Sequence, residues 1–304
     1  MKKVFYSNGK LLLTGEYVVL DGATALAIPT NYGQSLEISA SEKEGIQWKS
    51  FDEKNAVWFE EIFNQNSLKD SNLENTFSKT LSKILQEAKK LNISFLSENG
   101  GIQVTTKLGF PRNWGLGTSS TLINNIAQWA NADAFELLKN SFGGSGYDIA
   151  AAQNDSPILY KLKNAKPEFR KVQLPWEFTN SLFFVHLNKK QDSKEGIARY
   201  KSSSINKKEI QRISEISTDL LLCHSLSDFE KLMDAHEKII SQIIKLPTIK
   251  EQLFSDYPNT IKSLGAWGGD FVLATGVERD LDYFRDKGFD TIVPFAKMVK
   301  YHNQ

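Results

Sequence analysis

Cysteine is almost absent from this chain of 304 residues, in which Cys223 is the only one. A single cysteine excludes an intramolecular disulfide and a zinc site built from clustered cysteines. The four histidines do not fall at the spacing of metal-binding motifs such as HExxH. The sequence therefore gives no sign of a zinc enzyme.

Long apolar runs and an excess of charge of one sign are also lacking. The first ten residues lack the apolar stretch of a signal peptide, and the longest uncharged run, Asn113–Ala132, is rich in Asn, Ser, Gly and Gln. The 37 basic residues are balanced by 36 acidic ones, so the net charge of +1 creates no field that attracts nucleic acid or a membrane. We expect a cytoplasmic protein that binds neither.

The length of the chain, about twice a typical domain of about 150 residues, predicts two domains. Residues 4–63 are rich in β-branched and aromatic residues separated by turn residues, which predicts strands and hairpins. A shift to Lys, Asn and Pro between Lys163 and Pro175 places the boundary, which gives domains 1–172 and 173–304. The later elements are expected as helices at 75–91, 115–130, 207–223, 228–244 and 279–287, and strands at 101–108, 157–162, 181–187, 271–275 and 291–294. Ser227 and Glu230 predict a capping box at the start of the helix 228–244.

The segment Gly115-Leu116-Gly117-Thr118-Ser119-Ser120 has the form of a phosphate-binding loop. It follows an expected strand and opens a helix, so its first N–H groups lack partners, and the glycines let a phosphate approach the backbone. It matches neither the Walker pattern nor the dinucleotide fingerprint GxGxxG. A plain turn into a helix, capped by Ser119 or Ser120, remains the alternative.

Four segments together resemble motifs of the GHMP small-molecule kinases, the superfamily of galactokinase, homoserine kinase, mevalonate kinase and phosphomevalonate kinase. They occur in the family's order as residues 9–22 (GKLLLTGEYVVLDG), 111–120 (PRNWGLGTSS), 144–152 (GSGYDIAAA) and 265–271 (GAWGGDF). The GEY tripeptide, the GSGYD segment and Asp270 are most similar to the phosphomevalonate kinase branch, and mevalonate kinase is next.

The resemblance implies an α+β protein with the two-domain GHMP kinase fold. Its N-terminal domain would be similar to the second domain of ribosomal protein S5, and its C-terminal domain would be ferredoxin-like. ATP and Mg²⁺ are the implied cofactors, and the implied reaction is transfer of the γ-phosphoryl group to phosphomevalonate or mevalonate. A monomer or a homodimer is expected.

The resemblance also assigns roles to individual residues. The phosphates of the nucleotide would be held by the N–H groups of Gly115, Leu116, Gly117, Thr118, Ser119 and Ser120. Ser119 would offer its hydroxyl to Mg²⁺, Asp148 would accept or orient the proton of the attacking hydroxyl, and Lys10 would keep Asp148 ionised. Each residue has a structural alternative, because Ser119 and Asp148 are also suitable helix caps and Lys10 is also a suitable solvated lysine at a strand end.

Substrate contacts follow from the same resemblance and from charge. Glu16 matches the glutamate of the GEY tripeptide, and a structural ion pair explains it equally well. His236 lies on an apolar helical stripe, which favours a buried core histidine, although the matching helix of the family borders the substrate cleft. Eight basic residues against three acidic ones between Lys189 and Arg212 suit a phosphorylated substrate, and they also suit a solvated helix face. The predicted substrate residues are Glu16, Gly146, Lys189, Lys190, His236, Gly268 and Gly269.

Two departures from the family pattern keep other functions open. Only 30 residues separate Thr118 from Asp148, so we expect a helix to be missing or short there, with Glu136 as the one candidate for a second acidic Mg²⁺ ligand. Trp267 stands where the third glycine motif has a glycine. The alternatives are a protein similar to diphosphomevalonate decarboxylase and a non-catalytic nucleotide-binding protein.

Overall fold

The fold is described from a computed structural model that covers residues 2–65, 68, 75–97, 100–190, 193–203, 205–265 and 267–301, without the side chains of Ser193 and Lys194. Its residues form two compact units. The first unit contains Met1–Gly9, Tyr32–Arg112 and Leu116–Gln153, and the second contains Lys10–Asn31, Asn113–Gly115 and Asn154–Gln304. The second unit combines two N-terminal segments with the C-terminal residues, and its last segment begins at Asn154, before the boundary expected at residue 172.

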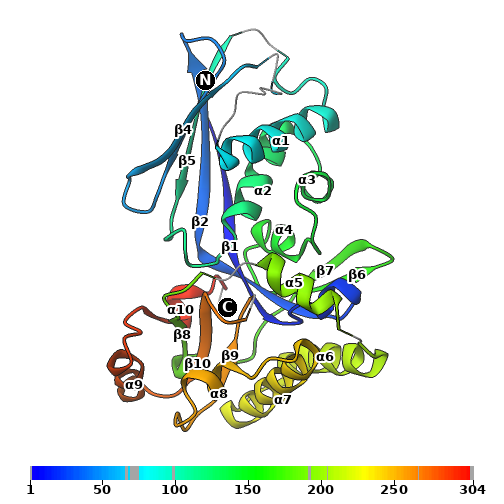
Figure 1. Ribbon diagram of the computed structural model, residues 1–304, viewed down its shortest axis with the longest axis vertical. Coiled ribbons are helices and arrows are strands. Elements are labelled where there is room, and N and C mark those ends of the chain that lie inside the picture. The colour runs from blue at the N-terminus through cyan, green and yellow to red at the C-terminus, as the bar shows by residue number, and fades with distance from the viewer. Residues whose placement is uncertain are drawn as a thin grey trace. The chain divides into compact units, whose positions relative to one another are not determined.

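A mixed sheet and three helices form the core of the first unit. Strand β3 (Ile46–Phe51) pairs antiparallel with β4 (Val57–Phe63) and parallel with β5 (Gly101–Leu108), and β5 pairs antiparallel with residues 34–41 of β2 (Ala25–Ser41). Figure 1 shows α1 (Thr76–Leu91), α2 (Thr118–Ala130) and α3 (Ala134–Ser141) on one side of these strands. Helix α1 buries one apolar face, α2 is buried on nearly all sides, and α3 packs against α1 and α2. The buried core between them includes Trp48, Leu81, Ile84, Val104, Ile123 and Ile126.

The second unit contains an antiparallel four-stranded sheet in the order β11-β8-β10-β9. Its strands are β8 (Leu182–His186), β9 (Ile261–Ser263), β10 (Phe271–Thr275) and β11 (Ile292–Pro294). The long helices α6 (Lys207–Asp219) and α7 (Leu226–Ile244) lie between β8 and β9 in the sequence, and α9 (Asp282–Asp286) lies between β10 and β11. Numbered along the chain, the strands lie in the order 4-1-3-2, which is the ferredoxin-like topology that we expected.

The remaining segments complete the two units. The second unit also contains a hairpin of β6 (Ile158–Lys163) and β7 (Lys166–Lys171), with β6 paired to residues 25–27 of β2. Strand β1 (Lys3–Thr14) pairs with β2, and both strands contribute residues to each unit. Shorter helices are α4 (Tyr147–Ala152), α5 (Ser193–Lys201), α8 (Ile249–Leu253) and α10 (Phe295–Met298), and 3-10 turns occupy Val18–Asp21, Thr179–Ser181, Leu220–Leu222 and Glu278–Leu281. In the described part of the chain, no helix combines the length and the apolar character that a membrane crossing needs.

Two local expectations were wrong. Helix α7 begins at Leu226, because Ser225 rather than Ser227 is its N-cap and accepts a hydrogen bond from the N–H of Asp228. The segment in which we placed the domain boundary contains β7, which pattern analysis did not predict because nearly all of its side chains are exposed and it therefore lacks apolar alternation. Asn164 and Ala165, both with positive φ, form the two-residue turn before it.

Candidate functional site

The glycine-rich segment opens α2 as expected. Gly117 is the N-cap with a left-handed backbone (φ 91°), a conformation that favours glycine, and no side chain caps the helix. The hydroxyl of Ser120 donates to the carbonyl of Gly117 at 2.9 Å, whereas the side chain of Ser119 is exposed. Ser119 is therefore not needed as a cap. Its hydroxyl and the first N–H groups of α2 are available to an anion or to a cation that accompanies it.

An aromatic cavity of about 390 Å³ lies beside the first turn of α2, within the first unit. Trp58, Phe77, Ile84 and Leu122 form its apolar walls, and Ser119 lines it together with Thr118. The Trp58 and Phe77 rings meet edge to face, with centroids 4.8 Å apart. The guanidinium of Arg112 lies 3.8 Å from the centroid of the Trp58 ring. The cavity therefore combines flat apolar walls with a polar end at the glycine-rich segment.

The indole N–H of Trp58 is the unusual polar group of this cavity. It is shielded from solvent and has no acceptor among the residues that the structure describes. A buried donor without an acceptor costs about 1–3 kcal/mol, so such groups are normally satisfied. The same burial closes this nitrogen to a molecule in the cavity, so Trp58 offers a bound ligand its flat ring and not its N–H group.

The residues just before the loop are held within the second unit. Lys10, on β1, donates from Nζ to the carbonyl of Gly115 at 2.8 Å. A side chain on Gly115 would overlap with the carboxyl group of Asp270. Nε2 of His186 lies 3.1 Å from the carbonyl oxygen of Asn113. Lys10 and the third glycine motif therefore meet at the first glycine of the loop, an arrangement that their separation in the sequence does not reveal.

Asp148 lies in the first turn of α4, which follows Gly146 (φ 85°). It is half-buried, and its Oδ1 accepts the N–H of Ile149 at 3.1 Å. Gly143 and Gly144 precede it with positive φ, and at both positions an added Cβ would meet no described atom within 4 Å. The loop before Asp148 is therefore open, as a residue that receives a proton from a bound molecule requires.

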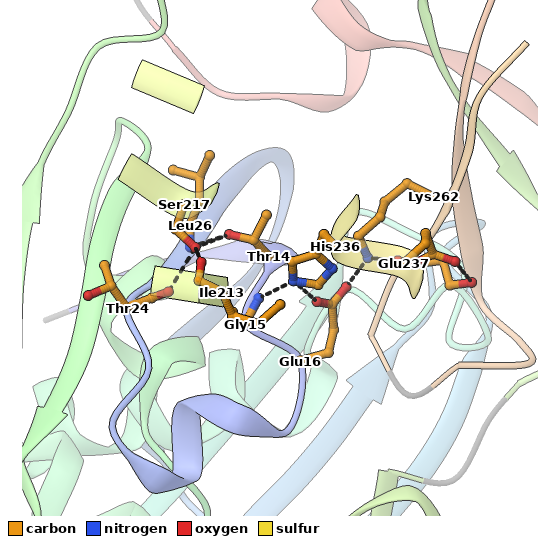
Figure 2. A network of polar contacts seen from close by, with 11 residues as sticks. Thr14, Gly15, Glu16, Thr24, Leu26, Ile213, Ser217, His236, Glu237 and Lys262 are labelled. Atoms are coloured by element: carbon orange, nitrogen blue, oxygen red, sulfur yellow. Dashed lines mark hydrogen bonds and ion pairs between the residues drawn. The ribbon is translucent and has the colours of Figure 1, made fainter. Parts of the chain in front are cut away.

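Glu16 and His236 are fully buried in the second unit, together with Glu237 and Lys262 (Figure 2). Lys262 donates to Oε1 of Glu16 at 2.5 Å, and Nε2 of His236 accepts the N–H of Gly15 at 2.9 Å. The sequence left a structural and a substrate-binding interpretation open for both residues. These contacts are those of a buried structural carboxyl group for Glu16 and of a core histidine for His236. Pattern analysis missed Lys262 and Glu237, although a lysine within the buried strand β9 was a usable signal.

Burial governs the protonation of this cluster. It raises the pKa of Glu16 to about 7, against the opposing effect of the Lys262 ammonium. It raises the pKa of Glu237 and lowers the pKa of His236 well below its ordinary value. Burial also disfavours the charged form of Lys262, but Glu16 and Glu237 outweigh it, so the pKa of Lys262 is raised.

The other predicted substrate residues lie near the third motif or at the surface. Lys189 and Lys190 are exposed, and the carbonyl of Lys189 accepts the N–H of Asp270 at 2.7 Å. Gly268 (φ 97°) and Gly269 follow Trp267, whose ring is buried in an apolar cluster with Tyr17 and Tyr200. Within the basic segment, residues 191, 192 and 204 and the side chains of Ser193 and Lys194 lie outside the described residues.

A complete metal site is not formed by protein side chains alone. The described residues contain no cluster of three or more His, Cys, Asp or Glu side chains that fits a metal ion. Glu136, on α3, is exposed and lies 3.9 Å from Lys139. Mg²⁺ in kinases takes ligands from the nucleotide phosphates, so one hydroxyl such as that of Ser119 is an adequate protein contribution.

No family model and no curated protein matches the sequence. Solved structures match it over nearly its whole length. The Methanococcus jannaschii mevalonate kinase superposes with a TM-score of 0.73 at 18% identity, over 100% of this chain and 99% of that one. The Streptococcus pneumoniae phosphomevalonate kinase in complex with phosphomevalonate and AMPPNP has a TM-score of 0.68 at 16% identity, over 96% and 99%. The Lactococcus lactis galactokinase with galactose has a TM-score of 0.68 at 14% identity, over 98% and 93%.

The chain has the fold of the GHMP small-molecule kinases. The expected α+β fold of two domains is thereby confirmed. The 30-residue interval between Thr118 and Asp148 contains α2 and the short helix α3, and α4 begins at its end.

Proposed function

We propose that the protein is an ATP-dependent kinase that transfers the γ-phosphoryl group to a small alcohol, either mevalonate or phosphomevalonate. The observation that carries the proposal is the position of Ser119, whose exposed hydroxyl lies in the first turn of α2 and at the wall of the aromatic cavity. A nucleoside triphosphate has the same two parts, a flat base and a chain of phosphates. The fold that the chain shares with mevalonate and phosphomevalonate kinases supports the same reaction.

The base of ATP fits the cavity that Trp58 and Phe77 line. An adenine ring is flat and would stack on the aromatic side chains that line the cavity. The phosphates would then extend to the N–H groups of residues 115–120, where the positive end of the α2 dipole favours negative charge. Mg²⁺, held by Ser119 and the phosphates, supplies neutralisation of the charge that develops during transfer.

Asp148 is the proposed proton acceptor for the attacking hydroxyl. Phosphoryl transfer depends mainly on positioning and charge stabilisation, so a carboxylate is needed chiefly to orient the hydroxyl and to take its proton. The open space at Gly143 and Gly144 would admit the substrate, and Gly146 would contact it. Lys10 would hold the carbonyl of Gly115, and its positive charge would help to keep Asp148 ionised.

The substrate would be recognised by Lys189 and Lys190, whose ammonium groups are exposed and suit an anionic group. Gly268 and Gly269, in the same motif as Asp270, would let the substrate approach the backbone. A phosphate on the substrate distinguishes phosphomevalonate from mevalonate, so these two lysines are the residues on which that choice depends.

Mass spectrometry of the reaction mixture tests the proposal. The protein is incubated with ATP, Mg²⁺ and mevalonate, phosphomevalonate or diphosphomevalonate in turn, with Asp148→Asn as the matched control. Gain of one phosphoryl group by mevalonate or phosphomevalonate is the expected result. Loss of carbon dioxide from diphosphomevalonate would instead identify a decarboxylase, and ATP binding without turnover of any of the three would contradict the kinase proposal.

A further inference from the structure

Four ionisable side chains share one buried site in the second unit (Figure 2). Glu16 follows β1, His236 and Glu237 are neighbours on α7, and Lys262 lies on β9. All four are nearly or completely inaccessible to solvent. Because buried charges must be balanced and every buried polar atom needs a partner, their contacts show where the protons lie.

Lys262 is charged and fully partnered. Its ammonium has three N–H donors and faces three oxygens: Oε1 of Glu16 at 2.5 Å, Oε1 of Glu237 at 3.1 Å, and the carbonyl of Ser263. A neutral amine would have one donor too few for this arrangement. Lys262 therefore brings one positive charge, which balances one carboxylate and not two.

Glu237 is that carboxylate. Its Oε2 accepts the hydroxyl of Ser263 at 2.9 Å, while its Oε1 faces the ammonium of Lys262. Oε2 has a donor, and Oε1, which forms no hydrogen bond, is paired by charge with the Lys262 ammonium, so these contacts favour the ionised form of Glu237. If Glu16 were also ionised, the cluster would carry a net buried charge of −1.

The second oxygen of Glu16 has a different environment. Oε2 lies 3.3 Å from Nε2 of His236 and has no other partner among the described residues. Nε2 already accepts the N–H of Gly15, so it carries the lone pair of the ring and the imidazole proton lies on Nδ1. An ionised Glu16 would place two lone pairs against each other, whereas a proton on Oε2 would turn the contact into a shared hydrogen bond.

We propose that Glu16 is a neutral carboxylic acid in the folded protein, and that its proton, directed at His236, positions the turn at the end of β1. Glu16 is thus a positioning residue, not a substrate ligand. The charged and titratable groups around it are His236 and Glu237 from α7 and Lys262 from β9. Burial raises the pKa of Glu16 to about 7, and burial keeps His236 neutral by lowering its pKa, so both effects leave the proton on Glu16.

The turn that this proton holds lies a short distance along the chain from Lys10. Gly15 has φ of 92°, and a side chain on it would overlap with Ala25, so the backbone there has little freedom. Thr14, the last residue of β1, is hydrogen-bonded to Ser217 at 2.7 Å. Hydrogen bonds to Ser217 of α6 and His236 of α7 therefore fix the end of β1. The same strand carries Lys10, whose ammonium donates to the carbonyl of Gly115.

The first test compares urea unfolding of the wild type and Glu16→Gln between pH 4 and pH 8. A glutamine keeps an acceptor for Lys262 and an N–H donor for His236, so it copies the protonated acid. In the wild type, folded Glu16 retains a proton that the unfolded chain releases above pH 4.5, so stability falls as the pH rises from 4.5 through 7. Relative to Glu16→Gln, the wild-type folding constant should fall about 200-fold between pH 4 and pH 8. Parallel pH profiles would overturn the proposal.

Glu237→Gln is the matched control. It removes the carboxylate that balances Lys262, so Glu16 should ionise in its place and the pH-dependent fall should move to lower pH. Infrared spectroscopy of the wild type tests the proposal even if a variant fails to fold. The infrared carbonyl band of a protonated carboxyl group should persist at pH 6, where exposed carboxylates are ionised, and its absence would contradict a neutral Glu16.

The positioning role rests on the proposed kinase function and has a separate readout. Wild-type kcat should decline above pH 7, as Glu16 ionises, more steeply than the kcat of Glu16→Gln. Equal pH profiles of kcat would overturn the positioning role. Because the unfolding and infrared tests need no activity, a failure of the kinase proposal is distinguishable from a failure of this one.

Discussion

The carboxyl group of Asp270 occupies the space that a side chain on Gly115 would need. The two residues are 155 positions apart, yet both belong to the second unit. The carbonyl oxygen of Gly115 accepts a hydrogen bond from the ammonium of Lys10. The carboxyl group of Asp270 lies beside the Cα of the same glycine. Glycine is therefore required here for space as well as for its positive φ of 66°.

Gly115→Ala should lower the free energy of unfolding by about 1–3 kcal/mol, because the new methyl group must displace Asp270 or the loop. Gly143→Ala is the matched control, since Gly143 has a similar φ of 74° but open space around it. Urea unfolding of both variants measures the difference. An equal loss in both would show that backbone strain alone decides the outcome.

Ser119→Ala should weaken Mg²⁺-dependent ATP binding and leave thermal stability unchanged, because the hydroxyl is exposed and caps nothing. Ser120→Ala should have the opposite pattern, with a loss of about 1 kcal/mol in stability, since the Ser120 hydroxyl bonds to the carbonyl of Gly117. Titration calorimetry with and without Mg²⁺, together with thermal unfolding, checks both. A stable Ser119→Ala protein with full Mg²⁺-dependent affinity would remove this residue from the site.

Trp58→Ala should weaken ATP binding about tenfold, because alanine removes the flat wall on which the base would stack. Tripolyphosphate, which has no base, should bind the variant and the wild type equally. Calorimetry with the two ligands separates base recognition from phosphate recognition. Equal ATP affinities of the two proteins would place the base elsewhere.

Asp148→Asn should reduce kcat by about 10²- to 10⁴-fold, the usual range for loss of a general base. A transfer step with a loose transition state would put the loss at the lower end, because the hydroxyl then needs little deprotonation. The variant keeps the shape of the side chain and the oxygen that accepts the N–H of Ile149. Rates are read beside the melting temperature, and a stable variant with near-full turnover would reassign Asp148 to a structural role.

Removal of charge at Lys189 and Lys190 by substitution with Gln should raise KM for phosphomevalonate and change KM for mevalonate much less. Both side chains are exposed, so stability should not change. Steady-state kinetics with the two substrates checks this. Equal effects on both would remove the argument for recognition of a phosphate.

Local patterns predicted most of the elements, including β5 at 101–108 and the helix that runs from the glycine-rich segment to Ala130. They missed β7, whose exposed face has no apolar alternation, and the two-residue shift at the start of α7, where Ser225 and Ser227 offer competing capping signals. The roles of the motif residues came from a family resemblance, because spacing alone does not assign a chemical task.

Long-range partners lay beyond the sequence. Glu16 and Lys262 are 246 positions apart, and neither local sequence indicates which residue is its partner. The same holds for the aromatic cavity, which Trp58 and Ser119 line from different elements. Hydrophobic periodicity locates a face, whereas the partner on that face is set by the topology of the sheet.

The glycine-rich segment changes unit between Gly115 and Leu116. Gly115 therefore packs with residues of the second unit, whereas Leu116, its covalent neighbour, packs with residues of the first. A ligand present at 100 times its dissociation constant adds about 2.7 kcal/mol to the stability of whatever must unfold to release it. Saturation with ATP should therefore raise the melting temperature, and amide hydrogen exchange in its presence shows which backbone groups are protected together with the loop.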